Sequence, residues 1–402
     1  MSWPRAVSLV NGRVVTAAGT ADSVRFARRI AAIGERPRAG DAVVDVQGAF
    51  VLPGLVNAHD HLELNHYGRL KFADRYDNAI DWIDDMRPRL SSDPGIRAGR
   101  SHPLADRLFI GALKNLLAGV TLVAHHNPFY RDFRCGLPIR VVRRYGWAHS
   151  FALEGQPAGA RGEPGGDVGT RWRSTPARLP FFVHLAEGVD ARAAAELPKL
   201  EALGCLAANT VLVHGVAIAA DGWRRIAASG GAVVWCPASN GFLFGRTIDV
   251  EASRAAGARV AIGTDSRITG SRDLLDELRS ARAAAATSAD DLLAMVTTRA
   301  ADIVRQPPAG QIAVGLPADL TVVPALADNA AEALLAAERR DIALVTIGGR
   351  PLFGSRGIAD RVFAARSVSA KALCVDGARK LASAALVRRI AGCSIAEPGV
   401  TV

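Results

Sequence analysis

Lysine, cysteine and long hydrophobic runs are scarce or absent in this 402-residue chain, and each scarcity excludes a class of protein. Lysine supplies only five of the 49 basic residues: Lys71, Lys114, Lys199, Lys371 and Lys380. The arginines occur as scattered pairs, such as Arg28-Arg29 and Arg339-Arg340, without the polybasic tail or aromatic-interleaved basic stripe that favours nucleic-acid binding. We therefore attribute the net charge of +10 to the arginine-rich composition and expect no nucleic-acid partner. The charge remains compatible with an anionic small-molecule substrate.

The number and spacing of the cysteines, and the absence of long apolar runs, indicate the cellular compartment of the protein. The cysteines are widely spaced and form no Cys-x-x-Cys motif: Cys135, Cys205, Cys236, Cys374 and Cys393. An odd number of such cysteines argues against a disulfide framework and favours a reducing compartment. Residues 1–15 lack the apolar core of a signal peptide, and no apolar run reaches the length of a membrane span. The sequence therefore predicts a cytoplasmic protein without a membrane partner.

The two ends of the chain share one pattern, and the middle has another. Short apolar runs separated by Gly, Asp and Pro occur within residues 6–46 and again within 318–353, which is typical of a small β-sandwich. Between them, apolar runs of strand length alternate with amphipathic stretches, which indicates βα units and a parallel sheet. We therefore predict an α/β fold in which residues 53–309 form a metal-binding (β/α) barrel. Residues 1–52 and 310–402 form a β-sandwich domain, with C-terminal helices between Leu373 and Ile395.

The strand spacing predicts a TIM-type barrel with one contracted βα unit. Strand-like runs are visible at Phe50–Val56, Val120–Ala124, Trp147–Leu153, Pro180–Val183, Thr210–Val213, Ala232–Trp235 and Arg259–Ile262. From His184 onward the units repeat every 25 to 30 residues, as in a barrel of ordinary size. The distance of 58 positions from His126 to His184 is too short for three such units, and the Gly/Pro-rich stretch Gly155–Arg178 contains no strand-like run. That stretch is either a lid over the site or disordered.

Two helices of the predicted barrel have clear boundary signals. Leu104 to Leu117 has apolar residues at helical spacing, and Gly119 is expected to end that helix. Ser288 with Asp291 is typical of a capping box, which predicts a helix running to Val304.

Ligand-type side chains follow several of the predicted strands. His59 and His61 are alternate residues of one extended segment, so both imidazoles can reach one point. His184, His214 and Asp265 each end a later strand. Because the carboxyl ends of parallel barrel strands open onto one face, we expect these side chains to converge there. Three or four imidazoles and one carboxylate predict a transition-metal site, with Zn²⁺ as the default metal.

The motifs around these residues resemble the amidohydrolase superfamily. The matching segments are Leu-Pro-Gly-Leu-Val-Asn-Ala-His-Asp-His at 52–61, His-Leu-Ala-Glu at 184–187, Val-His-Gly at 213–215, Cys-Pro-Ala-Ser-Asn at 236–240, Gly-Thr-Asp-Ser at 263–266 and the segment 310–320. The resemblance covers nearly the whole chain except residues 129–178. As a combined pattern these motifs are highly specific.

Within that superfamily the lysine scarcity narrows the subtype. Two-metal members usually bridge their ions with a carboxylated lysine on the fourth strand, and no lysine occurs between Lys114 and Lys199. The His-x-x-Glu of His184 and Glu187 resembles instead the one-metal cytosine, guanine and S-adenosylhomocysteine deaminases and the related triazine hydrolases. This resemblance implies one divalent metal, Zn or alternatively Fe or Mn, held by four residues: His59, His61, His184 and Asp265.

The resemblance also implies catalytic roles. A metal-activated water would attack the substrate, with Asp265 accepting its proton. Glu187 would carry that proton to the leaving nitrogen, and His214 would polarise the attacked group or orient the water. Residues after the first, second and seventh strands, His66, His126 and Asn240, are expected to contact the substrate. His149 is expected to be a core residue and His102 a surface residue.

We therefore predict a metal-dependent hydrolase that deaminates a cyclic amidine-like small molecule of the purine, pyrimidine or triazine type. Amide hydrolysis is one alternative, because Leu153-Glu154-Gly155 resembles the carboxylate ligand of sugar-phosphate deacetylases. Chloride displacement from a heterocycle on the same scaffold is another, and a non-catalytic scaffold homologue is a third. We expect a small-molecule substrate as the partner. A homodimer is the assembly that we consider for this chain.

Overall fold

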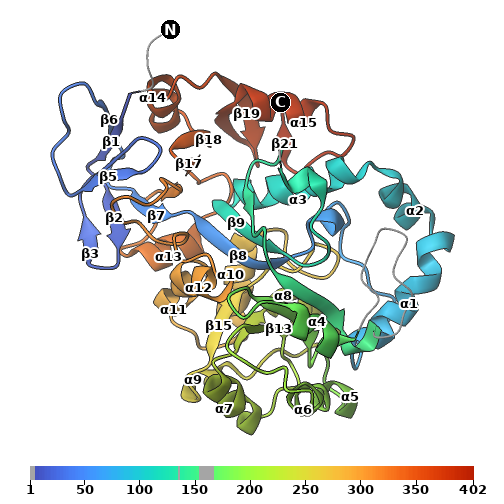
Figure 1. Cartoon of the computed structure of the whole chain (residues 1–402). Coiled ribbons are helices and arrows are strands. Elements are labelled where there is room, and N and C mark those ends of the chain that lie inside the picture. The colour runs from blue at the N-terminus through green and yellow to red at the C-terminus, as the bar shows by residue number, and fades with distance from the viewer. Residues whose placement is uncertain (1–4, 135, 154–166) are drawn as a thin grey trace.

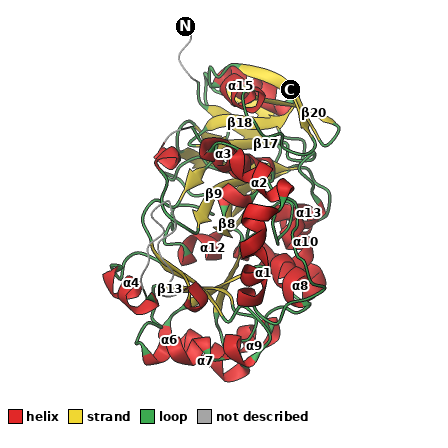
Figure 2. Ribbon diagram, turned by 90° about the vertical axis from the view of Figure 1, so that its right-hand side faces the viewer, coloured by secondary structure: helices red, strands yellow, loops and turns green. Residues whose placement is uncertain are grey.

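The computed structural model describes residues 5–134, 136–153 and 167–402 and has an α/β architecture (Figure 1). Strands lie in the middle of the molecule, with helices on the outside of one part and layered sheets at the other end (Figure 2). No helix among the described residues is long and apolar enough to cross a membrane. Cys205, Cys236, Cys374 and Cys393 are free thiols.

Residues 55–262 carry two parallel sheets. One sheet has the order β10-β9-β8 and consists of β8 (Leu55–Asp60), β9 (Val120–His125) and β10 (Arg140–Val141). The other runs consecutively through β11 (Gly146–Ser150), β12 (Phe181–Leu185), β13 (Thr210–His214), β14 (Ala232–Trp235) and β15 (Arg259–Ile262). In register, Leu185 pairs with His214, so neighbouring strands end at the same edge. The predicted parallel α/β arrangement is confirmed.

Helices connect these strands, as the periodicity predicts. α3 (Leu104–Leu117) has the predicted bounds, and Gly119 follows it with φ +82°, a left-handed backbone conformation that favours glycine. The other helices between β8 and residue 303 are α1 (Ala79–Ser92), α2 (Pro94–Ser101), α4 (Val168–Ser174), α5 (Ala191–Ala194), α6 (Glu196–Ala202), α7 (Ala220–Ser229), α8 (Pro237–Phe244), α9 (Val250–Ala255), α10 (Leu274–Ala284), α11 (Ala289–Met295) and α12 (Thr298–Ile303).

Several predicted elements differ from the structure. The run Phe50–Val56 divides at Gly54 into β7 (Phe50–Pro53) and β8, and a side chain at Gly54 would lie 2.2 Å from Thr121 Oγ1. Ser288 caps the N-terminus of the predicted helix, but the helix is divided by Val296 and Thr297 into α11 and α12. The predicted loop Gly155–Arg178 contains the helix α4, and its residues 155–166 lie outside the described residues. The region of the contracted unit contains the two-residue strand β10.

The terminal segments form two further sheets. One has the order β5-β4-β1-β6: β5 (Ile30–Ile33), β4 (Val24–Phe26), β1 (Val7–Val10) and β6 (Ala42–Asp45). The other has the order β21-β19-β20-β18-β17-β16-β7-β2-β3: β21 (Val400–Thr401), β19 (Ala370–Val375), β20 (Ala378–Ser383), β18 (Arg350–Ser355), β17 (Leu344–Ile347), β16 (Leu320–Val323), β7, β2 (Arg13–Thr16) and β3 (Gly19–Ala21). Both termini supply one hydrophobic cluster, which combines residues from 7–51 with residues from 312–381.

One prediction for the C-terminal segment was wrong. The region from Leu373 was expected to be helical, but it forms the antiparallel pair β19 and β20 before the helix α15 (Ala384–Ala391). Pairing with β18 provides these Ala-rich residues with backbone partners, so tertiary context outweighs helix propensity. Two further helices, α13 (Ala330–Ala336) and α14 (Ile358–Ala365), complete the terminal region.

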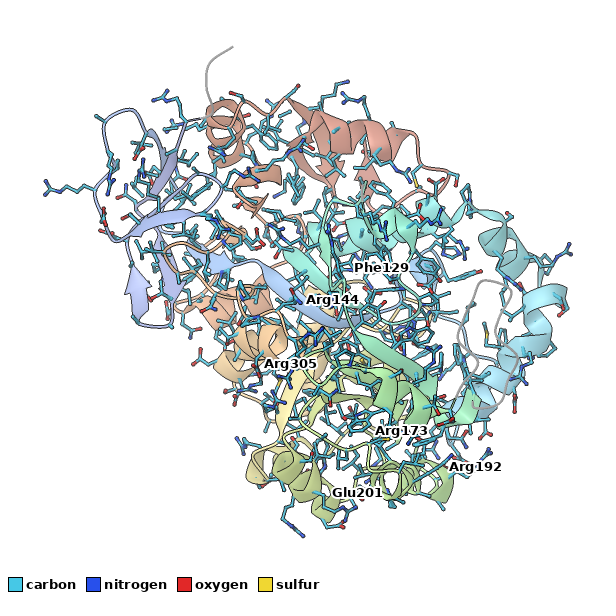
Figure 3. All side chains as sticks on the ribbon, viewed as in Figure 1. Phe129, Arg144, Arg173, Arg192, Glu201 and Arg305 are labelled. Carbon is cyan, nitrogen blue, oxygen red and sulfur yellow. The ribbon has the colours of Figure 1, made fainter. Side chains whose placement is uncertain are left out.

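Charged side chains are distributed around the molecule. Arg144, Arg173, Arg192 and Arg305 lie on separate segments (Figure 3). This distribution agrees with the scattered arginine pairs of the sequence.

Candidate metal centre

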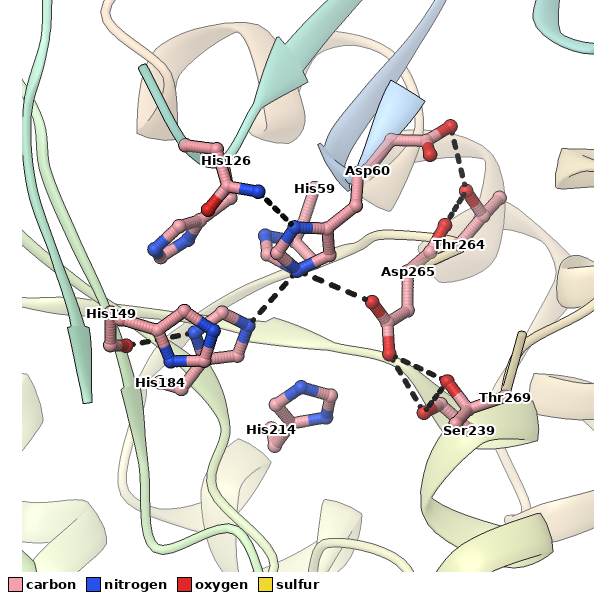
Figure 4. Close-up of polar contacts among 12 residues, drawn as sticks. His59, Asp60, His126, His149, His184, His214, Ser239, Thr264, Asp265 and Thr269 are labelled. Carbon is pink, nitrogen blue, oxygen red and sulfur yellow. Dashed lines mark hydrogen bonds and ion pairs between the residues drawn. The ribbon is translucent and has the colours of Figure 1, made fainter. Parts of the chain in front are cut away.

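The carboxyl ends of β8, β12, β13 and β15 bring together the side chains that the motifs singled out (Figure 4). These side chains are all buried: His59, His61, His184, His214 and Asp265. Ligand nitrogens of His59, His61 and His184 lie within 4.8 Å of one another. The predicted convergence at one face of the parallel strands is therefore present in the structure.

The ligand atoms face one point. His61 Nε2 and His184 Nε2 lie 3.3 Å apart. Asp265 Oδ1 lies 3.7 Å from His59 Nε2 and 3.6 Å from His61 Nε2. Nitrogen and carboxylate donors gathered at such distances are the ligand set that Zn²⁺ prefers. We call His59, His61, His184 and Asp265 the metal centre below.

Hydrogen bonds and burial leave lone pairs on the inner nitrogens. His184 Nδ1 donates to the His149 carbonyl at 2.8 Å, so its Nε2 carries a lone pair. The buried Nε2 atoms of His59 and His214 have no hydrogen-bond partner within the described part of the chain. Burial lowers the pKa of His59 to about 4 and that of His184 well below its usual value, so both rings are neutral at pH 7. Neutral imidazoles with inward-facing lone pairs beside one carboxylate fit a divalent cation.

Asp265 is held by hydroxyl groups on its outer side. Its Oδ2 accepts hydrogen bonds from Ser239 Oγ at 2.8 Å and Thr269 Oγ1 at 2.9 Å, which leaves Oδ1 facing the imidazoles. Burial alone would raise the pKa of Asp265, but the contact with His59 and the other neighbouring imidazoles hold it well below its usual value. Asp265 and His214 adopt the left-handed φ values +50° and +75°, which are uncommon for non-glycine residues.

Glu187 and His214 form a second pair beside the metal centre. Glu187 Oε1 lies 3.4 Å from His214 Nε2, and His214 Nδ1 donates to Asn240 Oδ1 at 2.8 Å. Burial raises the pKa of Glu187 to about 7. A carboxyl group with such a pKa can take up and release a proton near neutral pH.

A cavity of about 460 Å³ opens onto this centre. One end is lined by imidazole and carboxyl groups: His61, His184, His214, Glu187 and Asp265. The walls from α1 and α2 are mainly apolar, with Trp82, Ile83, Met86, Leu90 and Ile96. Three arginines line the same cavity: Arg87, Arg100 and Arg107. The cavity therefore combines a metal-binding end with apolar walls and positive charge.

The three predicted substrate residues do not line the described cavity. The ring of His126 lies 4.3 Å from that of His184, with its Nε2 near the Ala148 carbonyl at 3.1 Å. The ring of His66 packs against Tyr67 at 3.9 Å. Asn240 contacts His214, as described above. Their contact with substrate stays a prediction, and Glu154 lies outside the described residues.

Two cavity residues were missed or misplaced by the sequence reasoning. His149 was expected in the core, but it lines the cavity and its ring stacks 4.8 Å from that of His184. It lies near the end of β11, which ends at Ser150 and not at Leu153 as predicted, so the strand-end rule applied to the other histidines did not select it. Glu63 also lines the cavity and accepts a hydrogen bond from Asn127 Nδ2 at 2.7 Å. Its position two residues after His61 was the available signal.

Comparisons with known proteins agree with the motifs. The profile of the amidohydrolase family matches residues 183–352. A 5-methylthioadenosine/S-adenosylhomocysteine deaminase of Halobacterium salinarum is 31% identical over 355 residues, covering 74% of this chain and 78% of that relative. An aminodeoxyfutalosine deaminase of Deinococcus radiodurans is 49% identical over 71 residues, which is 18% of this chain and 17% of that relative.

Solved structures share the fold. An adenosine deaminase from Xanthomonas campestris with bound zinc superposes with a TM-score of 0.67 at 21% identity, covering 91% of this chain and 97% of that one. The atrazine chlorohydrolase from Arthrobacter aurescens complexed with zinc gives a TM-score of 0.66 at 18% identity, covering 90% of this chain and 99% of that one. The 31% identity to a relative matched over most of its length, together with the family profile, shows that the chain belongs to the amidohydrolase family.

Proposed function

We propose that this protein is a metal-dependent deaminase of a heterocyclic amine, with one Zn²⁺ held by His59, His61, His184 and Asp265. The observation that carries the proposal is the set of inward-facing ligand atoms beside the carboxyl group of Glu187. The deaminase activity named for the Halobacterium salinarum relative supports the same reaction class. The bound zinc of the Xanthomonas campestris structure supports the metal.

Each side chain has a role that follows from its contacts. When bound, the metal supplies Lewis-acid activation of a water molecule. Asp265 accepts the proton that this water loses, because its Oδ1 is the carboxylate oxygen left open by Ser239 and Thr269. Glu187, with its pKa of about 7, passes a proton to the leaving nitrogen, which departs as ammonia. His214, oriented by Asn240, hydrogen-bonds the attacked group.

The cavity indicates what surrounds the reacting group. A planar heterocycle carrying an amine fits the polar end, and an apolar substituent fits the walls from α1 and α2. Arg87, Arg100 and Arg107 favour substituents that end in an anionic group. The proposed substrate is therefore a purine-type or related amine with an apolar arm, and the arginines select acids over neutral analogues.

The proposed architecture is a closed TIM-type barrel over residues 53–309 and a β-sandwich domain from residues 1–52 and 310–402. Support for closure comes from Asp265 N, which donates to the His59 carbonyl at 3.2 Å and joins the end of β15 to β8. Support for the sandwich comes from the two terminal sheets and their shared hydrophobic cluster. We also keep the cytoplasmic location and the homodimer as predictions.

An ammonia-release screen tests the function. Zinc-loaded protein is assayed with adenosine, 5′-thioadenosine derivatives, guanine, cytosine and aminotriazines, with amides and chlorinated heterocycles in parallel. Release of ammonia from at least one heterocyclic amine, lost when the zinc is chelated and regained on reloading, is expected. Protein that retains one equivalent of zinc yet releases only acid from amides or chloride from heterocycles would contradict the proposal.

A further inference from the structure

A buried polar cluster lies on the side of β8 opposite the metal centre. Because side chains alternate along a strand, His59 and His61 face the metal centre whereas Asp60 points away from it (Figure 4). Asp60 and Lys114, from α3, are fully buried and form an ion pair with Nζ 3.1 Å from Oδ2. The ammonium group of Lys114 therefore lies buried between β8, α3 and the segment after β15.

Both carboxylate oxygens of Asp60 accept hydrogen bonds from neighbouring side chains. Its Oδ2 accepts from Asn115 Nδ2 at 2.8 Å, and its Oδ1 accepts from Asn65 Nδ2 at 2.7 Å. Thr264 Oγ1 and Asn57 Nδ2 each lie 3.2 Å from Oδ2. A buried charge is retained at such a position only where it is paired and hydrogen-bonded. We call Asp60, Lys114, Asn57, Asn65, Asn115 and Thr264 the Asp60 network.

The Asp60 network connects the segments that carry the metal ligands. Thr264, which directly precedes Asp265, has its Oγ1 3.2 Å from Lys114 Nζ and 2.8 Å from Asn57 Nδ2. Asn57 Oδ1 in turn accepts the backbone N–H groups of His59 at 3.3 Å and Thr264 at 3.1 Å. Lys114 Nζ also donates to Asn65 Oδ1 at 2.6 Å. One set of side chains therefore contacts the backbone next to His59 and next to Asp265.

These contacts are needed because β8 and β15 belong to different sheets. Within the described chain no strand ladder sets the distance between them, and one backbone–backbone hydrogen bond, from Asp265 N to the His59 carbonyl, joins the segments at their ends. Asp265 also adopts a left-handed backbone conformation, which persists only where the surroundings over-determine it. The Asp60 network supplies that constraint.

We propose that Asp60 and Lys114 are positioning residues that hold Asp265 at the correct distance from His59 and His61. The inference rests on the proposed function only in assigning the metal to these ligands. It concerns the affinity and geometry of the metal site, so metal binding tests it without reference to any substrate.

The variants are chosen so that the fold survives. Thr264→Val removes the hydroxyl that links Lys114 and Asp60 to the segment before Asp265, at nearly constant volume. The double variant Asp60→Asn with Lys114→Met removes both charges of the ion pair together, so neither is left unpaired. Thr346→Val is the matched threonine control, because its buried Oγ1 donates to the Ala318 carbonyl at 2.8 Å in the terminal region. Lys380→Met is the matched lysine control, because Lys380 is buried and bonds Ser355 Oγ at 2.7 Å.

Zinc affinity is measured by competition with a chromogenic chelator, and Co²⁺-loaded protein is examined by visible absorption. We expect both network variants to bind zinc about 10- to 100-fold more weakly and to change the cobalt bands. Both controls should bind zinc as the wild type does, even where they lower thermal stability. Folded network variants with wild-type zinc affinity and cobalt spectrum would overturn the inference. Tight zinc binding by the wild type without ammonia release would instead count against the proposed function alone.

Discussion

Replacing Glu187 with Gln should stabilise the metal-free protein and at the same time remove most of its turnover. Burial raises the pKa of Glu187 to about 7 from its ordinary value of 4.5. At a pH between 4.5 and about 7, the Glu187 carboxyl group is mostly protonated in the folded chain and mostly ionised in the unfolded chain. The stability that Glu187 contributes is therefore complete below pH 4.5 and is lost as the pH rises through 7. Gln has the same shape and does not ionise, so the variant keeps its stability at high pH.

The magnitude follows from the difference between the two pKa values. The change from 4.5 to about 7 corresponds to about 3 kcal/mol of unfolding free energy. Urea denaturation of metal-free protein at about pH 5 and about pH 8 should show Glu187→Gln gaining about 2 to 3 kcal/mol over the wild type at the higher pH. With zinc loaded, turnover should fall about 100- to 10,000-fold at unchanged zinc content.

The control for this experiment is Glu251→Gln, at an exposed glutamate on α9. That variant should follow the wild type at both pH values. An advantage of Glu187→Gln that is the same at both pH values would refute the argument from burial. Wild-type turnover in the zinc-loaded variant would refute the role of Glu187 as proton carrier.

Three further changes test other parts of the site. Asn240→Ala removes the acceptor that orients His214, so kcat should fall about 10- to 100-fold with zinc content unchanged, as steady-state kinetics and metal analysis would show. Arg107→Gln should raise KM about tenfold for a substrate whose arm ends in a carboxylate, and leave KM for its methyl ester unchanged. Glu397→Gln should lower the unfolding free energy by about 3–5 kcal/mol in urea, because its buried carboxylate pairs with Arg267 at 2.6 Å and with Arg339 at 2.5 Å.

Each of these three changes has a control or an outcome that would contradict its reasoning. Glu338→Gln breaks an exposed pair with Arg340 and should cost less than about 1 kcal/mol, so an equal loss in both glutamate variants would contradict the role of burial. Equal KM effects on the acid and its ester would contradict the charge argument for Arg107. Loss of zinc from Asn240→Ala would mean that Asn240 supports the metal site itself.

Local pattern accounts for most of what the sequence predicted correctly. The runs Ala232–Trp235 and Arg259–Ile262 coincide with β14 and β15, because buried parallel strands are continuous apolar segments. The helix Leu104–Leu117 was equally clear from its periodicity and its terminal glycine. The convergence of His59, His184 and Asp265 followed from their places after such strands, since parallel strands share one direction.

Predictions failed where partners distant in sequence decided the outcome. Residues 373–383 were expected to be helical, yet they form strands, because β18 offers an edge that the local sequence does not reveal. His149 was expected in the core because the predicted strand continued to Leu153, whereas β11 ends at Ser150, which pairs with His184 of β12. The arginines around the cavity come from three consecutive helices, and the sequence does not reveal which arginines of residues 87–107 face the cavity.

The sequence by itself determined which imidazoles and carboxylates converge: those that follow parallel strands, and that therefore meet at one face. That conclusion needs only strand period and strand direction, which are local properties. The tertiary structure alone decided what holds the centre in place. Lys114 and Asp60 lie 54 positions apart and meet because α3 packs against β8, and Thr264 joins them from the far end of the barrel region. Contacts of this kind depend on how elements pack, and packing is a property of the whole chain.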